Sequence, residues 1–136
     1  MNDYASAELG CMGNSQGRSV AVLVVEDETL IRMDTASSLK SAGFIVYEAE
    51  NAAKAIHCLE LHDEIRLIFT DVNMPGTMDG VALAHYVRGR WPPVKIIVTS
   101  GYVKVGENDL PPGSLFVEKP YDLENISDKM NALMAA

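Results

Sequence analysis

Carboxylate side chains stand at the ends of two apolar runs in this sequence. Glu26 and Asp27 directly follow the run over residues 20–25, and Asp71 closely follows the run over residues 67–69. Carboxylates that lie close together repel one another unless a proton or a cation offsets their charge. Oxygen ligands of this kind suit Mg²⁺, which combines one or two carboxylates with waters and phosphate oxygens. The pattern therefore predicts a magnesium site if the two runs are neighbours.

Hydrogen-bond donors follow two later apolar runs. Thr99 and Ser100 supply hydroxyl groups beside Gly101, and Lys119 supplies an ammonium group. Each of these alone is an ordinary loop residue. Hydroxyl and ammonium groups that converge on an acidic cluster are, however, donors suited to phosphoryl oxygens. Together the strand ends predict a site that holds a metal ion and a phosphoryl group.

The elements that must position these residues alternate along the chain. We expect five strands, over residues 20–25, 44–47, 67–70, 95–99 and 115–117. We expect helices between and after them, over residues 29–41, 52–61, 80–90 and 123–134. Strict alternation predicts an α/β fold: a flavodoxin-like, doubly wound parallel sheet of order 2-1-3-4-5 with helices on both faces. Ligands of such sheets bind beyond the carboxyl ends of the strands, where the polar residues above would meet.

Local signals refine two of the helical regions. In the first helix, Leu30, Met33 and Leu39 are expected to face inward, and Gly43 ends the helix. Residues 103–114 contain two prolines and two glycines and show little helical periodicity. The fourth helix of such a fold is therefore expected to be short, irregular or replaced by a loop.

Composition and length bound the remaining possibilities. The chain has 136 residues, which suits one domain: a flexible leader over residues 1–18 and a folded domain over residues 19–136. No apolar run is long enough to cross a membrane and no secretory signal is present, so we expect a cytoplasmic protein without a membrane partner. The net charge of −8 argues against direct nucleic-acid binding, and it reflects solubility, a cation site or both.

Five motifs occur in order, "VLVVEDE", "FTDVNMPG", "MDG", "IIVTSGY" and "FVEKPY". As a set they resemble the receiver domain of bacterial two-component response regulators, over about residues 20–135. The chain looks like a stand-alone, chemotaxis-regulator-like receiver of a divergent subgroup with a shortened fourth-helix region. Whether the sequence is complete or trimmed from a longer protein stays open.

The resemblance assigns roles to the acidic cluster. Asp71 matches the phosphoacceptor, which takes a phosphoryl group from a phosphohistidine. Asp27 matches a direct Mg²⁺ ligand together with Asp71, and Glu26 matches a ligand that acts through water. The backbone carbonyl of Asn73 matches the remaining protein ligand. Mg²⁺ is the implied cofactor, and Mn²⁺ could substitute for it.

The resemblance also assigns the donors. Lys119 matches the lysine that contacts the phosphoryl group, and the bond between Lys119 and Pro120 matches a peptide that is usually cis. The switch hydroxyl is Ser100 or Thr99. Ser100 is favoured because its glycine neighbour would leave a phosphoryl oxygen unobstructed, and Thr99 is the alternative.

The implied function is a phosphorylation-dependent switch. A sensor histidine kinase or a histidine phosphotransfer protein would phosphorylate Asp71, and the switch hydroxyl would move inward. Phe116, which matches the aromatic switch position, could then rotate and reshape the face offered to an unknown downstream protein. The chain would act as a single-domain response regulator or as a phosphorelay intermediate, with at most slow Mg²⁺-dependent self-dephosphorylation. Homodimers across the last strands and helix occur in the family, so a homodimer is a further partner to consider.

Two other functions are alternatives for this sequence. A receiver-like binding module without phosphorylation would keep the same fold. A small Mg²⁺-dependent phosphohydrolase would use the same aspartate as a nucleophile, but it needs a general acid two residues later. That position is Asn73, whose amide cannot exchange a proton as a carboxyl does.

Overall fold

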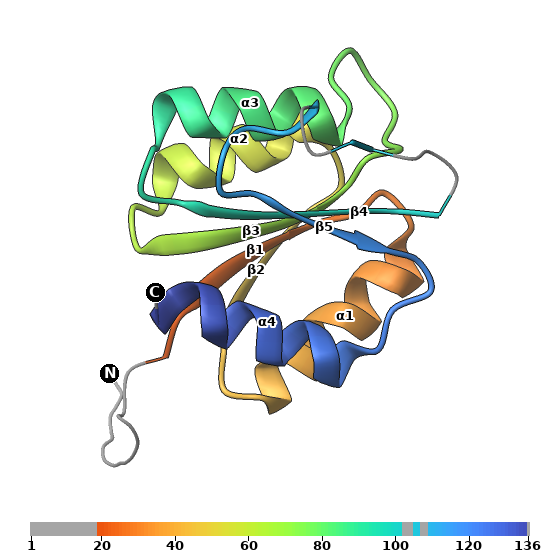
Figure 1. Cartoon of the computed structure of the whole chain (residues 1–136), viewed down its shortest axis with the longest axis vertical. Helices are drawn as coiled ribbons and strands as arrows, with labels where there is room; N and C mark the ends of the chain where they lie inside the picture. Colours follow the sequence, from red (N-terminus) through yellow and green to blue (C-terminus); the bar gives the residue numbers. More distant parts are fainter. Residues whose placement is uncertain (1–18, 102–104, 107–108, 136) are drawn as a thin grey trace.

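Five parallel strands form the centre of the molecule. The computed structural model describes residues 19–101, 105–106 and 109–135. The strands are β1 (Ala21–Val25), β2 (Ile45–Ala49), β3 (Ile65–Asp71), β4 (Lys95–Ser100) and β5 (Leu115–Glu118). They pair in the order β2-β1-β3-β4-β5, with every neighbouring pair parallel. The predicted flavodoxin-like sheet is confirmed (Figure 1).

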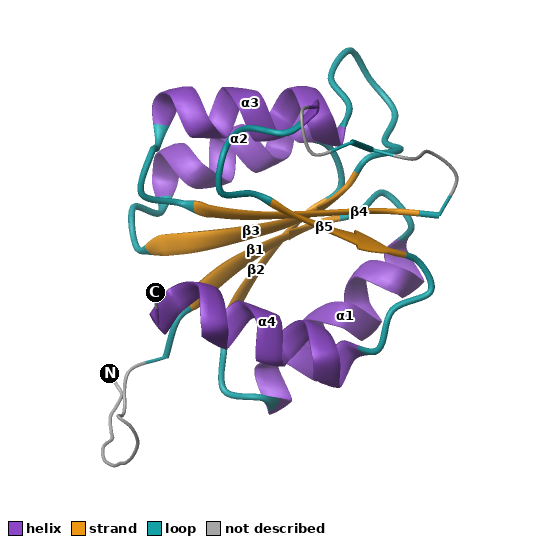
Figure 2. Ribbon diagram, viewed as in Figure 1, coloured by secondary structure: helices purple, strands orange, loops and turns teal. Residues whose placement is uncertain are grey.

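Helices cover both faces of the sheet. They are α1 (Thr29–Ser41), α2 (Ala52–Leu61), α3 (Gly80–Arg90) and α4 (Leu123–Ala135). The helices α2 and α3 lie on one face, and α1 and α4 lie on the other (Figure 2). Because each strand of a parallel pair needs a crossover connection, alternate helices can bury both faces of the strands. All five residues of β1 are accordingly buried.

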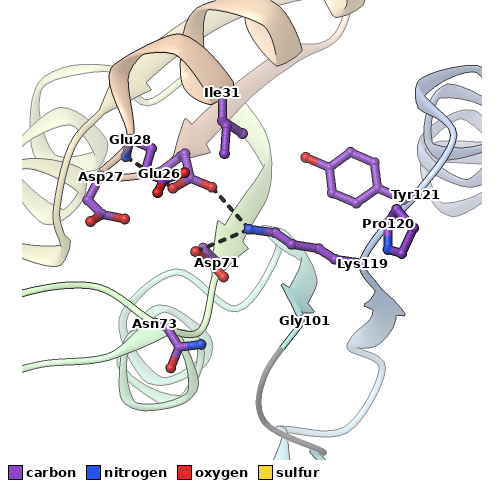
Figure 3. Close-up of a pocket in the computed structure, with 10 residues that line it drawn as sticks. All are labelled: Glu26, Asp27, Glu28, Ile31, Asp71, Asn73, Gly101, Lys119, Pro120 and Tyr121. Carbon is purple, nitrogen blue, oxygen red and sulfur yellow. Dashed lines mark hydrogen bonds and ion pairs between the residues drawn. The ribbon is translucent and has the colours of Figure 1, made fainter.

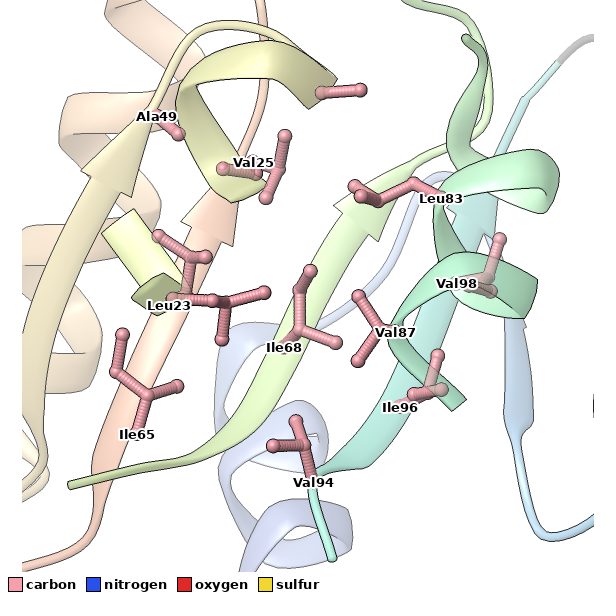
Figure 4. Close-up of a cluster of buried hydrophobic side chains, with 14 of the residues drawn as sticks. Leu23, Val25, Ala49, Ile65, Ile68, Leu83, Val87, Val94, Ile96 and Val98 are labelled. Atoms are coloured by element: carbon pink, nitrogen blue, oxygen red, sulfur yellow. The ribbon is translucent and has the colours of Figure 1, made fainter. Parts of the chain in front are cut away.

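Two apolar layers fill the space between the sheet and its helices. Side chains of alternating strand residues enter opposite layers, as the pleat requires. Ile68, Ile96 and Val98 pack with residues of α2 and α3 (Figure 4). Phe69 and Ile97 pack with residues of α1 and α4. The side-chain direction of any residue at a strand end therefore follows from its place in this alternation.

Capping residues fix where two helices begin. The Asn51 side chain accepts a hydrogen bond from the Lys54 backbone N–H at 2.8 Å, at the start of α2. Asp79 accepts one from the Ala82 N–H at 2.9 Å, at the start of α3. Gly43, just beyond α1, has a φ of +102°, a conformation that favours glycine.

The inner face of α1 differs from the predicted one. Leu39 is buried as expected, but Leu30 is 82% exposed and Met33 is 55% exposed. The buried residues Thr35 and Ala36 lie next to Leu39 on the helix surface, so the buried face of α1 is rotated away from Leu30 and Met33. The prediction was wrong because apolar side chains were assumed to face inward, and two of them instead form an exposed surface on α1.

The segment between β4 and β5 contains no α-helix among its described residues, 105–106 and 109–114. Leu110 and Pro111 are nonetheless buried, and the His85 Nε2 atom lies 2.7 Å from the Asp109 carbonyl oxygen. The described residues 109–111 thus pack against α3 outside any α-helix, as expected for an irregular fourth-helix region. The leader predicted over residues 1–18 lies outside the described residues.

No helix in the described part of the chain has the length and apolar character that crossing a bilayer requires.

Candidate functional site

The polar strand ends meet at one pocket of about 610 Å³, at the carboxyl ends of the strands (Figure 3). Residues of β3 and α1 line it, together with residues of the segments that follow β1, β3, β4 and β5. These residues are Glu26, Asp27, Glu28, Ile31, Asp71, Asn73, Gly101, Lys119, Pro120 and Tyr121. The convergence follows from the strand order, because β1 and β3 are neighbours at the point where the order reverses.

The three carboxylates form a cluster that fits a divalent cation. One oxygen atom of each of Glu26, Asp27 and Asp71 lies within 4.8 Å of the others. Glu26 and Asp71 are buried, and Asp27 is exposed toward the opening. The Asp71 Oδ1 atom is buried and has no hydrogen-bond partner among the described residues. A hard cation that prefers oxygen ligands would satisfy this atom and offset the three charges.

Lys119 supplies cationic contacts to the cluster. Its Nζ atom lies 3.4 Å from Glu26 Oε1 and 3.4 Å from Asp71 Oδ2 (Figure 3). Burial acts to lower the pKa of Lys119, but attraction by Asp71 and Glu26 outweighs it and raises that pKa. The ammonium group therefore stays charged and points at the two buried carboxylates.

Burial has the opposite effect on the two carboxyl groups. It raises the pKa of Asp71, although Lys119 and a hydrogen bond from the Asn73 backbone act against the shift. It also raises the pKa of Glu26, with the Glu28 N–H hydrogen bond at 3.1 Å acting against it. Without a cation, burial therefore disfavours the ionised forms of Glu26 and Asp71, and a bound cation would favour those forms.

This cost predicts a stability effect. Because the folded-state pKa of Asp71 is raised, its contribution to stability is present at acidic pH and is lost as pH rises through the folded pKa. In metal-free buffer at pH 7, Asp71→Asn is expected to raise the free energy of unfolding by on the order of 1 kcal/mol. The gain should disappear toward pH 4, and Mg²⁺ should stabilise the wild type more than the variant.

Chemical denaturation with and without chelator, from pH 4 to pH 7, measures this effect. Asp128→Asn, which changes an exposed carboxylate on α4, is the control and should change stability little. If the metal-free Asp71→Asn variant is less stable than the wild type at pH 7, the ion pair with Lys119 alone offsets the cost of burying the ionised Asp71 carboxylate.

Two close backbone approaches build the pocket walls. A Cβ atom on Gly80 would lie 2.1 Å from the Asp71 carbonyl oxygen, so the start of α3 packs directly on the phosphoacceptor candidate. A Cβ atom on Gly101 would lie 3.3 Å from the Lys119 Cβ atom. The Lys119–Pro120 peptide bond is cis, which confirms the prediction for Pro120.

The two candidate hydroxyls face opposite sides of the sheet. Ile97 packs in the layer of α1 and α4, and Val98 packs in the layer of α2 and α3. Alternation places Thr99 on the side of Ile97, and Ser100 on the side of Val98. Thr99 is the register partner of Asp71, and both residues line one small internal chamber. Thr99, the alternative in the sequence interpretation, thus lies on the Asp71 side of the sheet, and the favoured Ser100 lies on the other side.

Phe116 lies on the side of the sheet away from Thr99. Its register partner is Val98, and it packs half-buried against the layer of α2 and α3. Ser100 follows Val98 by two residues and so shares the side of Phe116. The sequence interpretation assumed that Ser100 both reaches the phosphoryl pocket and packs beside Phe116. In the structure these two positions belong to different residues, because Ser100 lies on the side of Phe116 and Thr99 lies on the side of Asp71.

Sequence reasoning missed three residues at this site. Ile31 lines the pocket from α1, and Tyr121 lines it from the segment after Pro120. The Tyr121 hydroxyl lies 3.4 Å from the Thr35 Oγ1 atom of α1, across 86 positions of sequence. The last motif includes Tyr121, but only the fold reveals its partner.

Comparison with known proteins identifies the family. The family described as "Response regulator receiver domain" matches residues 22–131. The chain is 33% identical over 120 residues to the sensor kinase CckA of Brucella abortus, a match that covers 85% of this chain and 13% of that protein. It is 32% identical over 108 residues to the transcriptional regulatory protein PdtaR of Mycobacterium tuberculosis, covering 77% of this chain and 52% of that one. The chain thus spans only part of these relatives.

Solved structures show the same likeness. A response regulator receiver protein from Sinorhizobium medicae superposes with a TM-score of 0.80 at 28% identity, covering 87% of this chain and 96% of that one. The receiver domain of the hybrid histidine kinase CckA superposes with a TM-score of 0.71 at 30% identity, covering 84% and 98%. With its acidic pocket at the switch point of the sheet, this chain belongs to the response regulator receiver domain family.

Proposed function

We propose that the chain is a phosphorylation-dependent signalling switch, whose phosphoacceptor is Asp71. The observation that carries the proposal is the buried Asp71 carboxylate, held 3.4 Å from the Lys119 Nζ atom and beside two further carboxylates. A lone surface aspartate would have none of these partners. The expected donor is a sensor histidine kinase or a histidine phosphotransfer protein, in keeping with the kinase among the relatives.

The residues of the pocket would have different roles in phosphoryl transfer. Asp27, Asp71 and the Asn73 carbonyl would hold Mg²⁺ directly, and Glu26 would hold it through water. Bound Mg²⁺ supplies positive charge that keeps the acceptor ionised and stabilises the phosphoryl oxygens. An Asp71 oxygen attacks the phosphorus atom, and the bond from phosphorus to the donor nitrogen breaks. Lys119 stabilises the negative charge that spreads over the equatorial oxygens.

The donor is expected to approach across α1. Leu30 and Met33 are exposed apolar side chains on this helix, and Ile31 extends from it to the pocket lining. Exposed apolar surface next to a functional pocket is typical of a protein docking site. This arrangement favours a protein donor that covers the pocket during transfer.

Thr99 is proposed as the switch hydroxyl in place of Ser100. Its hydroxyl lies on the same side of the sheet as Asp71 and has no hydrogen-bond partner among the described residues. A phosphoryl oxygen on Asp71 would accept a hydrogen bond from it. Because Phe116 lies on the other side of the sheet, the signal would pass through movement of the β4 backbone. Ser100, on the side of Phe116, would transmit that movement by packing.

The two hydroxyls can be separated by a matched pair of variants. Thr99→Ala is expected to lower the population of the activated state by roughly tenfold or more, because a hydrogen bond to a charged group contributes about 1.5–3 kcal/mol. Ser100→Ala is expected to leave that population within about twofold, because Ser100 lies on the side of the sheet opposite to Asp71. NMR shifts of Phe116 with Mg²⁺ and saturating beryllofluoride measure the populations. The reverse ranking would return the switch role to Ser100.

Beryllofluoride, which mimics a phosphoryl group on a carboxylate, tests the switch itself. With Mg²⁺ it is expected to shift the resonances of the pocket and of Phe116 in the wild type, and to do so far less in Asp71→Asn. Magnesium shifts without any beryllofluoride response would instead identify a receiver-like binding module. Sustained multiple turnover of a phosphate ester would identify a phosphohydrolase.

A further inference from the structure

A small chamber lies beneath Asp71, inside the layer that α1 and α4 cover. Residues of β1, α1, β3, β4 and the segment after β5 enclose it, namely Val24, Val25, Glu26, Thr35, Phe69, Asp71, Thr99 and Tyr121. It offers about 10 Å³ to the centre of a water-sized sphere. That volume is at the size needed for one water molecule and is far too small for a larger ligand.

The chamber walls carry polar groups that lack partners. The Thr99 Oγ1 and Asp71 Oδ1 atoms are buried without a hydrogen-bond partner among the described residues. Leaving such a group unpaired costs roughly 1–3 kcal/mol. Thr35 and Tyr121 add two hydroxyls, whose oxygens are 3.4 Å apart and leave further hydrogen-bonding capacity. A buried water typically makes about three hydrogen bonds, and these walls supply them.

We propose that this chamber binds one ordered water in the unphosphorylated protein. The water would accept a hydrogen bond from the Thr99 hydroxyl, and it would bridge that group to the Thr35 and Tyr121 hydroxyls, with the Asp71 carboxylate as a further acceptor. The link ties β4 to α1 and to the segment that leads into α4. Tyr121 is then a positioning residue, which acts through the water rather than on the phosphoryl group.

The bound water would distinguish the unphosphorylated state from the phosphorylated state, an inference that rests on the proposed function. A Thr99 hydroxyl that donates into the chamber cannot donate at the same time to a phosphoryl oxygen. Phosphorylation of Asp71 would therefore draw Thr99 away and leave the water one partner short. The β4, α1 and α4 elements would lose their shared polar link in the same event.

Oxygen-17 magnetic relaxation dispersion of the 136-residue chain counts long-lived internal waters and tests the proposal. Thr99→Val, which keeps the side-chain shape, is expected to lose the signal of one water. Val24→Ile, which fills the chamber while leaving its polar groups in place, should also lose one. Thr77→Val changes an exposed threonine in the loop before α3 and should lose none.

An unchanged count in a folded Thr99→Val variant, or in Val24→Ile if the former does not fold, would overturn the proposal. A wild type that loses one long-lived water when Mg²⁺ and beryllofluoride are added would support it. The count in the resting protein does not depend on phosphorylation. A chain with the water but without phosphoryl uptake would refute only the proposed function, and the converse would refute only the chamber water.

Discussion

Asp71→Asn is expected to lower covalent phosphoryl uptake from acetyl phosphate by roughly 10³-fold or more, to the detection limit of intact-mass measurement. In the wild type, a carboxylate oxygen attacks phosphorus while acetate leaves with the electrons of the broken bond. An amide has no charged oxygen for this attack. The effect should be near total because, on the proposed assignment, the nearby Asp27 and Glu26 would hold the cation and would not attack the phosphorus.

A neighbouring carboxylate provides a matched control for this loss. Asp79 caps α3 next to the pocket, and its side chain accepts the Ala82 N–H hydrogen bond. Asparagine caps helices about as well as aspartate, so Asp79→Asn should fold normally and keep phosphoryl uptake within a fewfold of the wild type. Equal uptake by the wild type and Asp71→Asn would place the phosphoryl group elsewhere.

The second large effect concerns Gly80, at the first position of α3. A methyl group there would lie 2.1 Å from the Asp71 carbonyl oxygen and 2.8 Å from the Val72 Cα atom. Both contacts are with backbone, which cannot rotate away, so α3 or the end of β3 must move. Gly80→Ala is expected to cost about 3 kcal/mol, a fall in the melting temperature of roughly 10 °C. The same displacement moves Asp71, so phosphoryl uptake should also fall.

Gly89, on the same helix, is the matched control. A methyl group on Gly89 meets no heavy atom within 4 Å, and the residue is exposed. Gly89→Ala is therefore expected to raise stability by about 0.5–1 kcal/mol, because alanine favours helix more than glycine does. Thermal unfolding of the two variants measures both effects. A Gly80→Ala protein as stable as Gly89→Ala would contradict the packing of α3 on Asp71.

The order of the strands could be predicted because apolar runs and helical patterns alternate without interruption. The same alternation placed Asp71 and the acidic pair at adjacent strand ends, and the proline-rich segment after β4 excluded a regular helix there. These are local signals, which a sequence displays directly. The acidic cluster and Lys119 therefore lie together in the structure, as expected.

Other features depend on contacts that a sequence does not display. The rotation of α1 about its axis decides that Leu30 is exposed, and apolar character alone predicted the reverse. A shift of one residue separates Thr99 from Ser100, and only the strand register shows that Thr99 is the partner of Asp71. The hydrogen bond between Thr35 and Tyr121 joins segments 86 positions apart. The close approach of Gly80 to Asp71 is likewise a matter of tertiary packing.

The central claim is that Asp71 becomes an aspartyl phosphate. Borohydride reduces an acyl phosphate to an alcohol, so treatment of the Mg²⁺- and acetyl phosphate-loaded wild type would leave homoserine at the modified position. Mass spectrometry of the digested protein then locates that residue. The account predicts homoserine at position 71 and nowhere else, with the signal lost when Mg²⁺ is chelated. Homoserine at another position, or an unmodified chain that still binds Mg²⁺, would contradict it.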